Sequence, residues 1–186
     1  MADPFSSILS LTRAAVERYD MLPAGASVAV GVSGGKDSLV LLVALARLRE
    51  FFPTPFSLTA ITLDPVFEGR QTDYSPVASL CEELRVPYIV RRTRLWEVVF
   101  EERREANPCS LCARMRRGAL HAAAKEAGCS FVALGPQKRR GGDLSHESAG
   151  GRHPGLLFAE KLSGQAGSHP YPPADIRAGS GYRPLR

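Results

Sequence analysis

This sequence of 186 residues has no long apolar run, few cysteines and no excess of acidic residues. No apolar run approaches a membrane span and the Met-Ala-Asp-Pro start does not begin a secretory leader, so we expect a soluble, cytoplasmic protein that contacts no membrane. Four cysteines, two of them in one Cys-x-x-Cys, do not form a disulfide framework and suit metal or redox use in a reducing compartment. The net charge of +5 fits a polyanionic partner such as RNA.

A strand, a glycine-rich turn and a helix follow one another near the start of the chain. Residues 28–32 predict a buried strand, residues 39–48 predict a helix packed on a sheet, and Ser-Gly-Gly-Lys-Asp-Ser joins them. Adjacent glycines permit close ligand approach and unusual φ values, and amides that begin a helix form an anion site. Lys36 adds positive charge, and a magnesium ion between Asp37 and a phosphate would explain the carboxylate. Because Asp37 follows Lys36, this is not a Walker loop.

Strand and helix signals alternate over the first 135 residues. This alternation predicts an α/β fold with a doubly wound parallel sheet. Asp64 ends the second strand, where such sheets place ligands, and Cys81 lies in an apolar helical stripe that we expect in the core. The predicted strands are 28–32, 56–63, 87–90 and 130–134, and the predicted helices are 4–19, 39–48, 74–84, 95–100 and 108–127.

A second chemical motif lies at residues 107–121. Asn107 and Pro108 predict a helix start, which places Cys109 and Cys112 on one face of the first turn, where the helix dipole favours thiolates. From the spacing alone, the pair fits half of a zinc site, a redox pair, iron–sulfur ligation or two inert core cysteines.

Both motifs resemble known families. The turn at 33–38 resembles the pyrophosphate loop of the ATP pyrophosphatase superfamily, whose members adenylate a carbonyl oxygen with ATP. Together with Pro-Cys-Ser-Leu-Cys-Ala-Arg-Met-Arg-Arg-Gly-Ala-Leu-His at 108–121 and Leu-Trp-Glu-Val-Val-Phe at 95–100, it resembles the tRNA 2-thiocytidine synthetase family. The resemblance implies an adenine nucleotide alpha hydrolase-like (Rossmann-like) fold, ATP, Mg²⁺ and a 4Fe-4S cluster held by three cysteines. The implied substrate is a cytidine of the tRNA anticodon loop, converted to 2-thiocytidine.

The resemblance also implies roles for single residues. Lys36 and Asp37 are the expected catalytic residues, and Cys109 and Cys112 are expected to be two cluster ligands. The expected ATP-binding residues are Ser33, Gly34, Gly35, Lys36, Asp37, Ser38 and Asp64. Three arginines whose charge and place suit RNA backbone contact follow the cysteines: Arg114, Arg116 and Arg117. Expected partners are tRNA and a sulfur donor such as a cysteine desulfurase, with a homodimer as a candidate assembly.

The resemblance ends after Gly135. The family continues with a histidine, a pair of acids and later a third cysteine, whereas this chain continues with Pro-Gln-Lys-Arg-Arg and has no cysteine after Cys129. Residues 136–186 lack any helical or strand period, so we expect an incomplete ATP-binding domain at 1–135 and a poorly ordered tail that arose by truncation or frameshift. The missing groups predict that catalysis by this chain alone is impaired. Alternative functions are another adenylating tRNA-modifying enzyme of the superfamily and a non-catalytic nucleotide- or RNA-binding protein.

Overall fold

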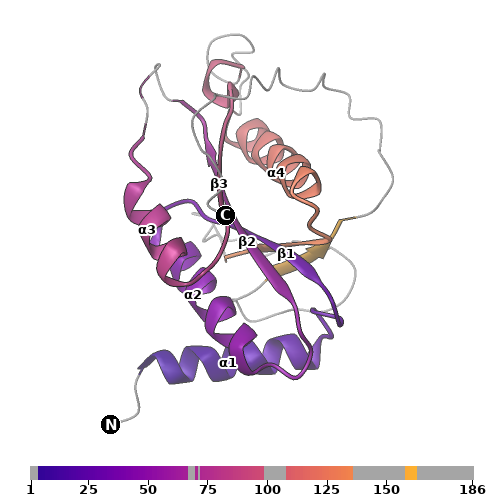
Figure 1. Ribbon diagram of the computed structural model, residues 1–186. Helices are drawn as coiled ribbons and strands as arrows, with labels where there is room; N and C mark the ends of the chain where they lie inside the picture. Colours follow the sequence, from indigo (N-terminus) through magenta and orange to yellow (C-terminus); the bar gives the residue numbers. More distant parts are fainter. Residues whose placement is uncertain (1–3, 67–69, 71, 99–107, 136–157, 163–186) are drawn as a thin grey trace.

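The computed structural model describes residues 4–66, 70, 72–98, 108–135 and 158–162 and shows an α/β fold built on one sheet (Figure 1). The helices are α1 (Pro4–Arg18), α2 (Lys36–Phe51), α3 (Ser75–Glu83) and α4 (Pro108–Glu126). The strands are β1 (Ser27–Gly31), β2 (Ser57–Asp64), β3 (Tyr88–Arg92), β4 (Phe131–Leu134) and β5 (Phe158–Lys161). The helix predicted at 95–100 is described over 95–98 as a short helical turn. Among the described residues, no helix has the length and apolar character needed to span a bilayer.

The sheet has the strand order β3-β2-β1-β4-β5. β1 pairs in parallel with β2 and with β4, and β2 pairs in parallel with β3, so the predicted parallel sheet is confirmed. Val28, Ala29 and Val30 of β1 are all fully buried. A central parallel strand is covered on both faces, which explains why its sequence is continuously apolar rather than alternating.

β5 is absent from the predicted elements. It pairs antiparallel with β4, with Phe131 opposite Lys161. Four residues are too few to establish a strand period in the sequence, so the pairing depends on tertiary context. The rest of the predicted tail lies outside the described residues, and the expectation of poor order there stays a prediction.

The two faces of the sheet are covered by different helices. One face packs with α1, α2 and α3 around a core cluster that includes Leu42 and Cys81. The other face packs with α4 around a cluster that includes Ile61 and Ala124. Figure 1 shows α4 on the opposite side of the sheet from α2 and α3. Cys81 is 1% exposed, so its predicted place in the core is confirmed.

The periodicity of α1 allowed either Leu11 or Thr12 to face the core. The structure buries Thr12, which is 2% exposed, and leaves Leu11 59% exposed. The Thr12 hydroxyl donates to the carbonyl oxygen of Ile8 at 2.8 Å. This bond satisfies the polar group within its own helix, so the side chain can be buried.

The carboxyl ends of the parallel strands meet at one edge of the sheet. The strand-to-helix connections place the first residues of α2 and α4 at this edge as well, which makes it the expected ligand side of the fold. The packing beside β1 is close: a Cβ on Gly31 would lie 2.7 Å from Cδ2 of Leu134 and 2.9 Å from Cδ2 of Leu120. Only glycine allows β4 and α4 to approach the end of β1 so nearly.

Candidate functional site

Residues 33–38, which we call the phosphate loop, join the end of β1 to the first turn of α2. Gly34 has a φ of 79°, in the left-handed region that favours glycine. Gly35 is the N-cap of α2 and has a φ of −76° and a ψ of 150°, which any residue can adopt. The expectation that both glycines supply unusual φ values is therefore wrong for Gly35.

Hydrogen bonds inside the phosphate loop decide which amides face outward. The carbonyl oxygen of Gly35 accepts from the backbone nitrogens of Ser38 and Leu39, both at 3.1 Å. The amide of Gly35 donates to Oγ of Ser33 at 3.4 Å. Among the described residues, no hydrogen bond engages the amides of Lys36 and Asp37. Of the five amides in the predicted anion site at 34–38, those of Gly35 and Ser38 are used within the loop, so the amides of Gly34, Lys36 and Asp37 remain for an anion.

Some polar side chains of the phosphate loop are exposed to solvent, and one is buried in the protein. Residues 33–37 are exposed, so the side chains of Lys36 and Asp37 are both accessible at the positive end of a 16-residue helix. Ser38 is only 7% exposed, and its Oγ donates to the Gly35 carbonyl oxygen at 2.8 Å. The hydroxyl of Ser33 is therefore the more accessible of the two, whereas the hydroxyl of Ser38 stabilises the loop conformation.

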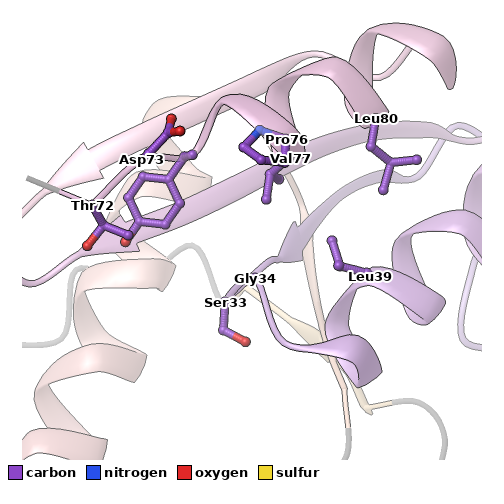
Figure 2. A pocket seen from close by; sticks show the side chains of 9 residues that line it. Ser33, Gly34, Leu39, Thr72, Asp73, Pro76, Val77 and Leu80 are labelled. Atoms are coloured by element: carbon purple, nitrogen blue, oxygen red, sulfur yellow. The ribbon is translucent and has the colours of Figure 1, made fainter.

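A pocket of about 340 Å³ lies beside the phosphate loop, between α2 and α3. Figure 2 shows Leu39 of α2 facing Leu80 of α3 at one end of the pocket and Thr72 and Asp73 toward the other, with Ser33 and Gly34 on the loop across from them. The full lining is Ser33, Gly34, Leu39, Thr72, Asp73, Tyr74, Pro76, Val77 and Leu80. The pocket thus combines an apolar slot with a polar mouth, and Ser33 and Gly34 of the phosphate loop form part of its wall.

Asp64 lies at the carboxyl end of β2, as predicted, but it contacts protein. It is 2% exposed, and its Oδ1 accepts from the amide of Val66 at 3.0 Å. The phenol of Tyr74 interacts with the side chains of Asp64 and Thr72 and with the charge of Arg116, and burial raises the pKa of Tyr74 above its usual value. Asp64 therefore supports the pocket wall, and its predicted contact with ATP stays a prediction.

Three polar pocket residues were missed as site residues by the sequence analysis. Thr72, Asp73 and Tyr74 line the pocket, and their only sequence signal was a position at or just before the start of the helix predicted at 74–84. The positive charge of Arg116 on α4 also acts through space on the Tyr74 phenol, in the direction that lowers its pKa. The strand-to-helix connections place the phosphate loop and the start of the arginine-bearing helix at one edge of the sheet.

The cysteines do not gather into one described site. Cys112 is half-buried in the first turns of α4, and the helix begins at Pro108 as predicted, while the side chain of Cys109 and all of Asn107 lie outside the described residues. Cys81 and Cys129 are buried in core clusters on opposite faces of the sheet. Burial raises the pKa of Cys81 to about 11, which keeps it a neutral thiol. Within the described ranges, no group of three or more His, Cys, Asp or Glu residues is placed to hold a metal ion.

Three arginines of α4 follow Cys112 along the helix, and all three side chains are exposed: Arg114, Arg116 and Arg117. The exposure of these side chains agrees with the predicted surface role, and their contact with RNA stays a prediction.

Comparison with known proteins gives consistent matches. The family model for the PP-loop domain matches residues 10–139. The tRNA-cytidine(32) 2-sulfurtransferase of Pelobacter propionicus is 40% identical over 122 residues, which are 65% of this chain and 45% of that protein. The tRNA-cytidine(32) 2-sulfurtransferase of Alkalilimnicola ehrlichii is 40% identical over 126 residues, which are 67% of this chain and 40% of that protein.

A solved structure is similar as well. The U34-tRNA thiolase NcsA from Methanococcus maripaludis, solved with its 4Fe-4S cluster, aligns with a TM-score of 0.56 and 30% identity, covering 70% of this chain and 44% of that one. The chain spans about half the length of the curated relatives it matches. The matched residues 10–139 contain the phosphate loop, the parallel strands and α4. On this match, with its parallel sheet and glycine-rich turn after β1, the chain belongs to the PP-loop domain family.

Proposed function

We propose that this chain is the ATP-binding part of a PP-loop enzyme that thiolates tRNA. The observation that carries the proposal is the pair of outward amides at Lys36 and Asp37, which open a helix beside a pocket of about 340 Å³. Helix N-terminal amides bind phosphate groups, and this volume suits a small-molecule ligand. Relatives named as tRNA sulfurtransferases support the reaction class.

The pocket suits the remainder of the nucleotide. The apolar slot formed by Leu39, Val77 and Leu80 would accept the adenine ring, and the polar mouth at Thr72 and Asp73 would face the ribose hydroxyls. The triphosphate would then run along the phosphate loop, where the amides of Lys36 and Asp37 donate hydrogen bonds. Lys36 would balance the phosphate charge.

The chemistry follows from this placement. The O2 atom of a cytidine attacks the α-phosphorus of ATP, the bond to pyrophosphate breaks, and the base carries AMP as a leaving group. A sulfur nucleophile then attacks C2, and AMP departs with the original oxygen. Lys36 and the loop amides stabilise the charge that develops on pyrophosphate. A magnesium ion bound through Asp37 would share that charge.

The described residues do not complete a three-cysteine cluster site. Cys109 and Cys112 are three residues apart on α4, and the other two cysteines of the sequence, Cys81 and Cys129, lie in separate core clusters. A 4Fe-4S cluster on Cys109 and Cys112 would therefore need a third thiolate from outside this sequence. We assign no sulfur-transfer step to residues of this chain.

The lack of a third cysteine for the cluster also favours an alternative function. Without a third ligand, the chain would be a non-catalytic protein that binds nucleotide through the phosphate loop and RNA through α4. Anaerobic purification separates the two: a brown protein that contains iron and sulfide supports the thiolase, and a colourless protein that binds ATP supports the alternative. A tRNA substrate would place either protein in the cytoplasm. The domain boundary near residue 135, the sulfur donor and the homodimer stay predictions.

ATP binding is tested with a matched pair of variants on α2. We expect Lys36→Ala to weaken binding of Mg-ATP by about tenfold or more, measured by calorimetry. Arg47→Ala removes the same charge from an exposed site about 16 Å further along the helix and should leave the affinity unchanged. Equal affinities for wild type and Lys36→Ala would overturn the proposed phosphate site. If the anaerobically purified chain holds the cluster and thiolates tRNA, Cys109→Ala should retain ATP binding and abolish 2-thiocytidine formation.

A further inference from the structure

Three hydroxyl groups, of which those of Thr62 and Ser38 are buried, connect the phosphate loop to β3. Tyr88 of β3 donates from its phenol to Oγ1 of Thr62 at 2.8 Å, and Thr62 of β2 donates to the carbonyl oxygen of Val32 at 2.8 Å. On the other side of the same peptide group, the nitrogen of Ser33 donates to Oγ of Ser38 at 3.2 Å. Ser38 then donates to the carbonyl oxygen of Gly35 at 2.8 Å.

The direction of these bonds is fixed by chemistry. A carbonyl oxygen can only accept, so Thr62 uses its single proton on Val32, and the proton between Thr62 and Tyr88 must come from Tyr88. Ser38 likewise uses its proton on Gly35 and accepts from the Ser33 amide. All four bonds therefore point from β3 toward the start of α2, and bonds aligned in one direction polarise and strengthen one another.

Burial makes these groups depend on one another. Thr62 is 1% exposed and Ser38 is 7% exposed, so water cannot replace a lost partner at either hydroxyl. An unpaired buried donor or acceptor is costly, which holds the peptide between Val32 and Ser33 in one orientation. This peptide is the point at which β1 ends and the phosphate loop begins.

We propose that Thr62 and Tyr88 are positioning residues for the phosphate loop, which they hold ready for ATP through the peptide of Val32 and Ser33. The inference rests on the proposed ATP site and adds two residues that touch no nucleotide. Gly34 would otherwise leave the loop many conformations, and ordering them at the moment of binding would reduce affinity. A loop already ordered by buried hydroxyls presents the amides of Lys36 and Asp37 without that loss.

Two substitutions at Thr62 distinguish a role in positioning the phosphate loop from a role in the stability of the fold. Thr62→Val keeps the shape but removes the hydroxyl, and we expect it to weaken binding of ATP and of inorganic pyrophosphate by about tenfold. Thr62→Ser keeps the hydroxyl but loses a methyl group, and we expect a lower Tm with an affinity within about threefold of wild type. Tyr88→Phe removes only the hydrogen bond from Tyr88 to Thr62, so we expect its ATP affinity to lie between those of Thr62→Val and Thr62→Ser.

Thr12→Val is the matched control, because Thr12 is also buried and also donates to a carbonyl oxygen at 2.8 Å, but in α1. It should leave both affinities unchanged. A readout without ligand comes from amide hydrogen exchange: in Thr62→Val the Ser33 amide should exchange faster than in wild type, and in Thr62→Ser it should not.

The outcomes are distinguishable. If wild type binds pyrophosphate and Thr62→Val binds it equally well, the positioning role is wrong and the ATP site stands. If affinity follows Tm across all the variants, the hydroxyls serve folding alone and the inference is overturned. If wild type binds neither ATP nor pyrophosphate, the proposed function fails together with the inference.

Discussion

Gly135, at the end of β4, lies directly against the main chain of Asp37 in the first turn of α2. A Cβ on Gly135 would sit 3.4 Å from the carbonyl oxygen of Asp37 and 3.6 Å from the nitrogen of Ser38. These are ordinary contact distances, so a methyl group fits but a larger side chain does not. The end of β4 therefore sets how far the phosphate loop can move toward the sheet.

The first prediction tests this contact by size. Gly135→Ala should bind ATP within about threefold of wild type, whereas Gly135→Leu should displace the first turn of α2 and weaken binding by about tenfold or more. Calorimetric titration with Mg-ATP measures both, and thermal melts report whether the fold persists. Similar affinities for the leucine variant and wild type would show that β4 does not limit the loop.

The second prediction separates the two loop glycines by backbone conformation. Gly34 has a φ of 79°, so Gly34→Ala should lower the free energy of unfolding by about 1–2 kcal/mol. Gly35 has a φ of −76° and only Oγ of Ser33 near the place of a Cβ, at 3.4 Å, so Gly35→Ala should change stability by less than about 1 kcal/mol. Urea unfolding of both variants checks this, and equal losses would contradict the assigned dihedral angles.

The third prediction concerns thiol reactivity. Cys112 is half-exposed in α4, whereas Cys81 and Cys129 are buried, and burial raises the pKa of Cys81 to about 11. A thiol whose pKa lies above the working pH stays protonated and nucleophilically weak. In brief anaerobic labelling with a maleimide at pH 8, peptide mass spectrometry should find Cys112 modified and both buried cysteines unmodified. Cys81 and Cys129 should react only after addition of denaturant.

Local patterns were sufficient to predict β1, the phosphate loop and α2. An apolar run, a glycine-rich turn and an apolar helix follow one another without interruption, and each local preference agrees with the fold. The α/β alternation then predicted the parallel pairing, and the burial of Cys81 followed from helical spacing.

Tertiary contacts determined what the sequence could not show. The amides of Gly35 and Ser38 bond within the loop whereas those of Lys36 and Asp37 do not, and no local pattern reveals which amides are used in this way. Tyr74 lines the pocket because α3 packs beside the phosphate loop, an arrangement that no local pattern around residue 74 reveals. Thr62 lies inside a β-forming run, where a threonine is an ordinary strand residue, so its buried hydroxyl gave no signal.

The last prediction separates RNA binding from nucleotide binding along α4. The exposed arginines Arg114 and Arg117 should contact RNA phosphates, so replacing either with Gln should weaken tRNA binding and reduce the salt dependence of log K by about one unit per lost contact. Neither change should alter ATP affinity. Arg116→Gln should weaken tRNA binding in the same way and also leave the ATP affinity unchanged. Filter binding at several salt concentrations measures the tRNA slopes.

Lys125 supplies the control on the same helix. It lies in the last turn of α4, at the opposite end from the arginines, so Lys125→Gln removes one positive charge without changing the proposed RNA surface. Its tRNA affinity and salt slope should match wild type. If Lys125→Gln lowers the slope as much as Arg114→Gln does, the binding reflects net charge alone, and α4 has no particular RNA-binding end.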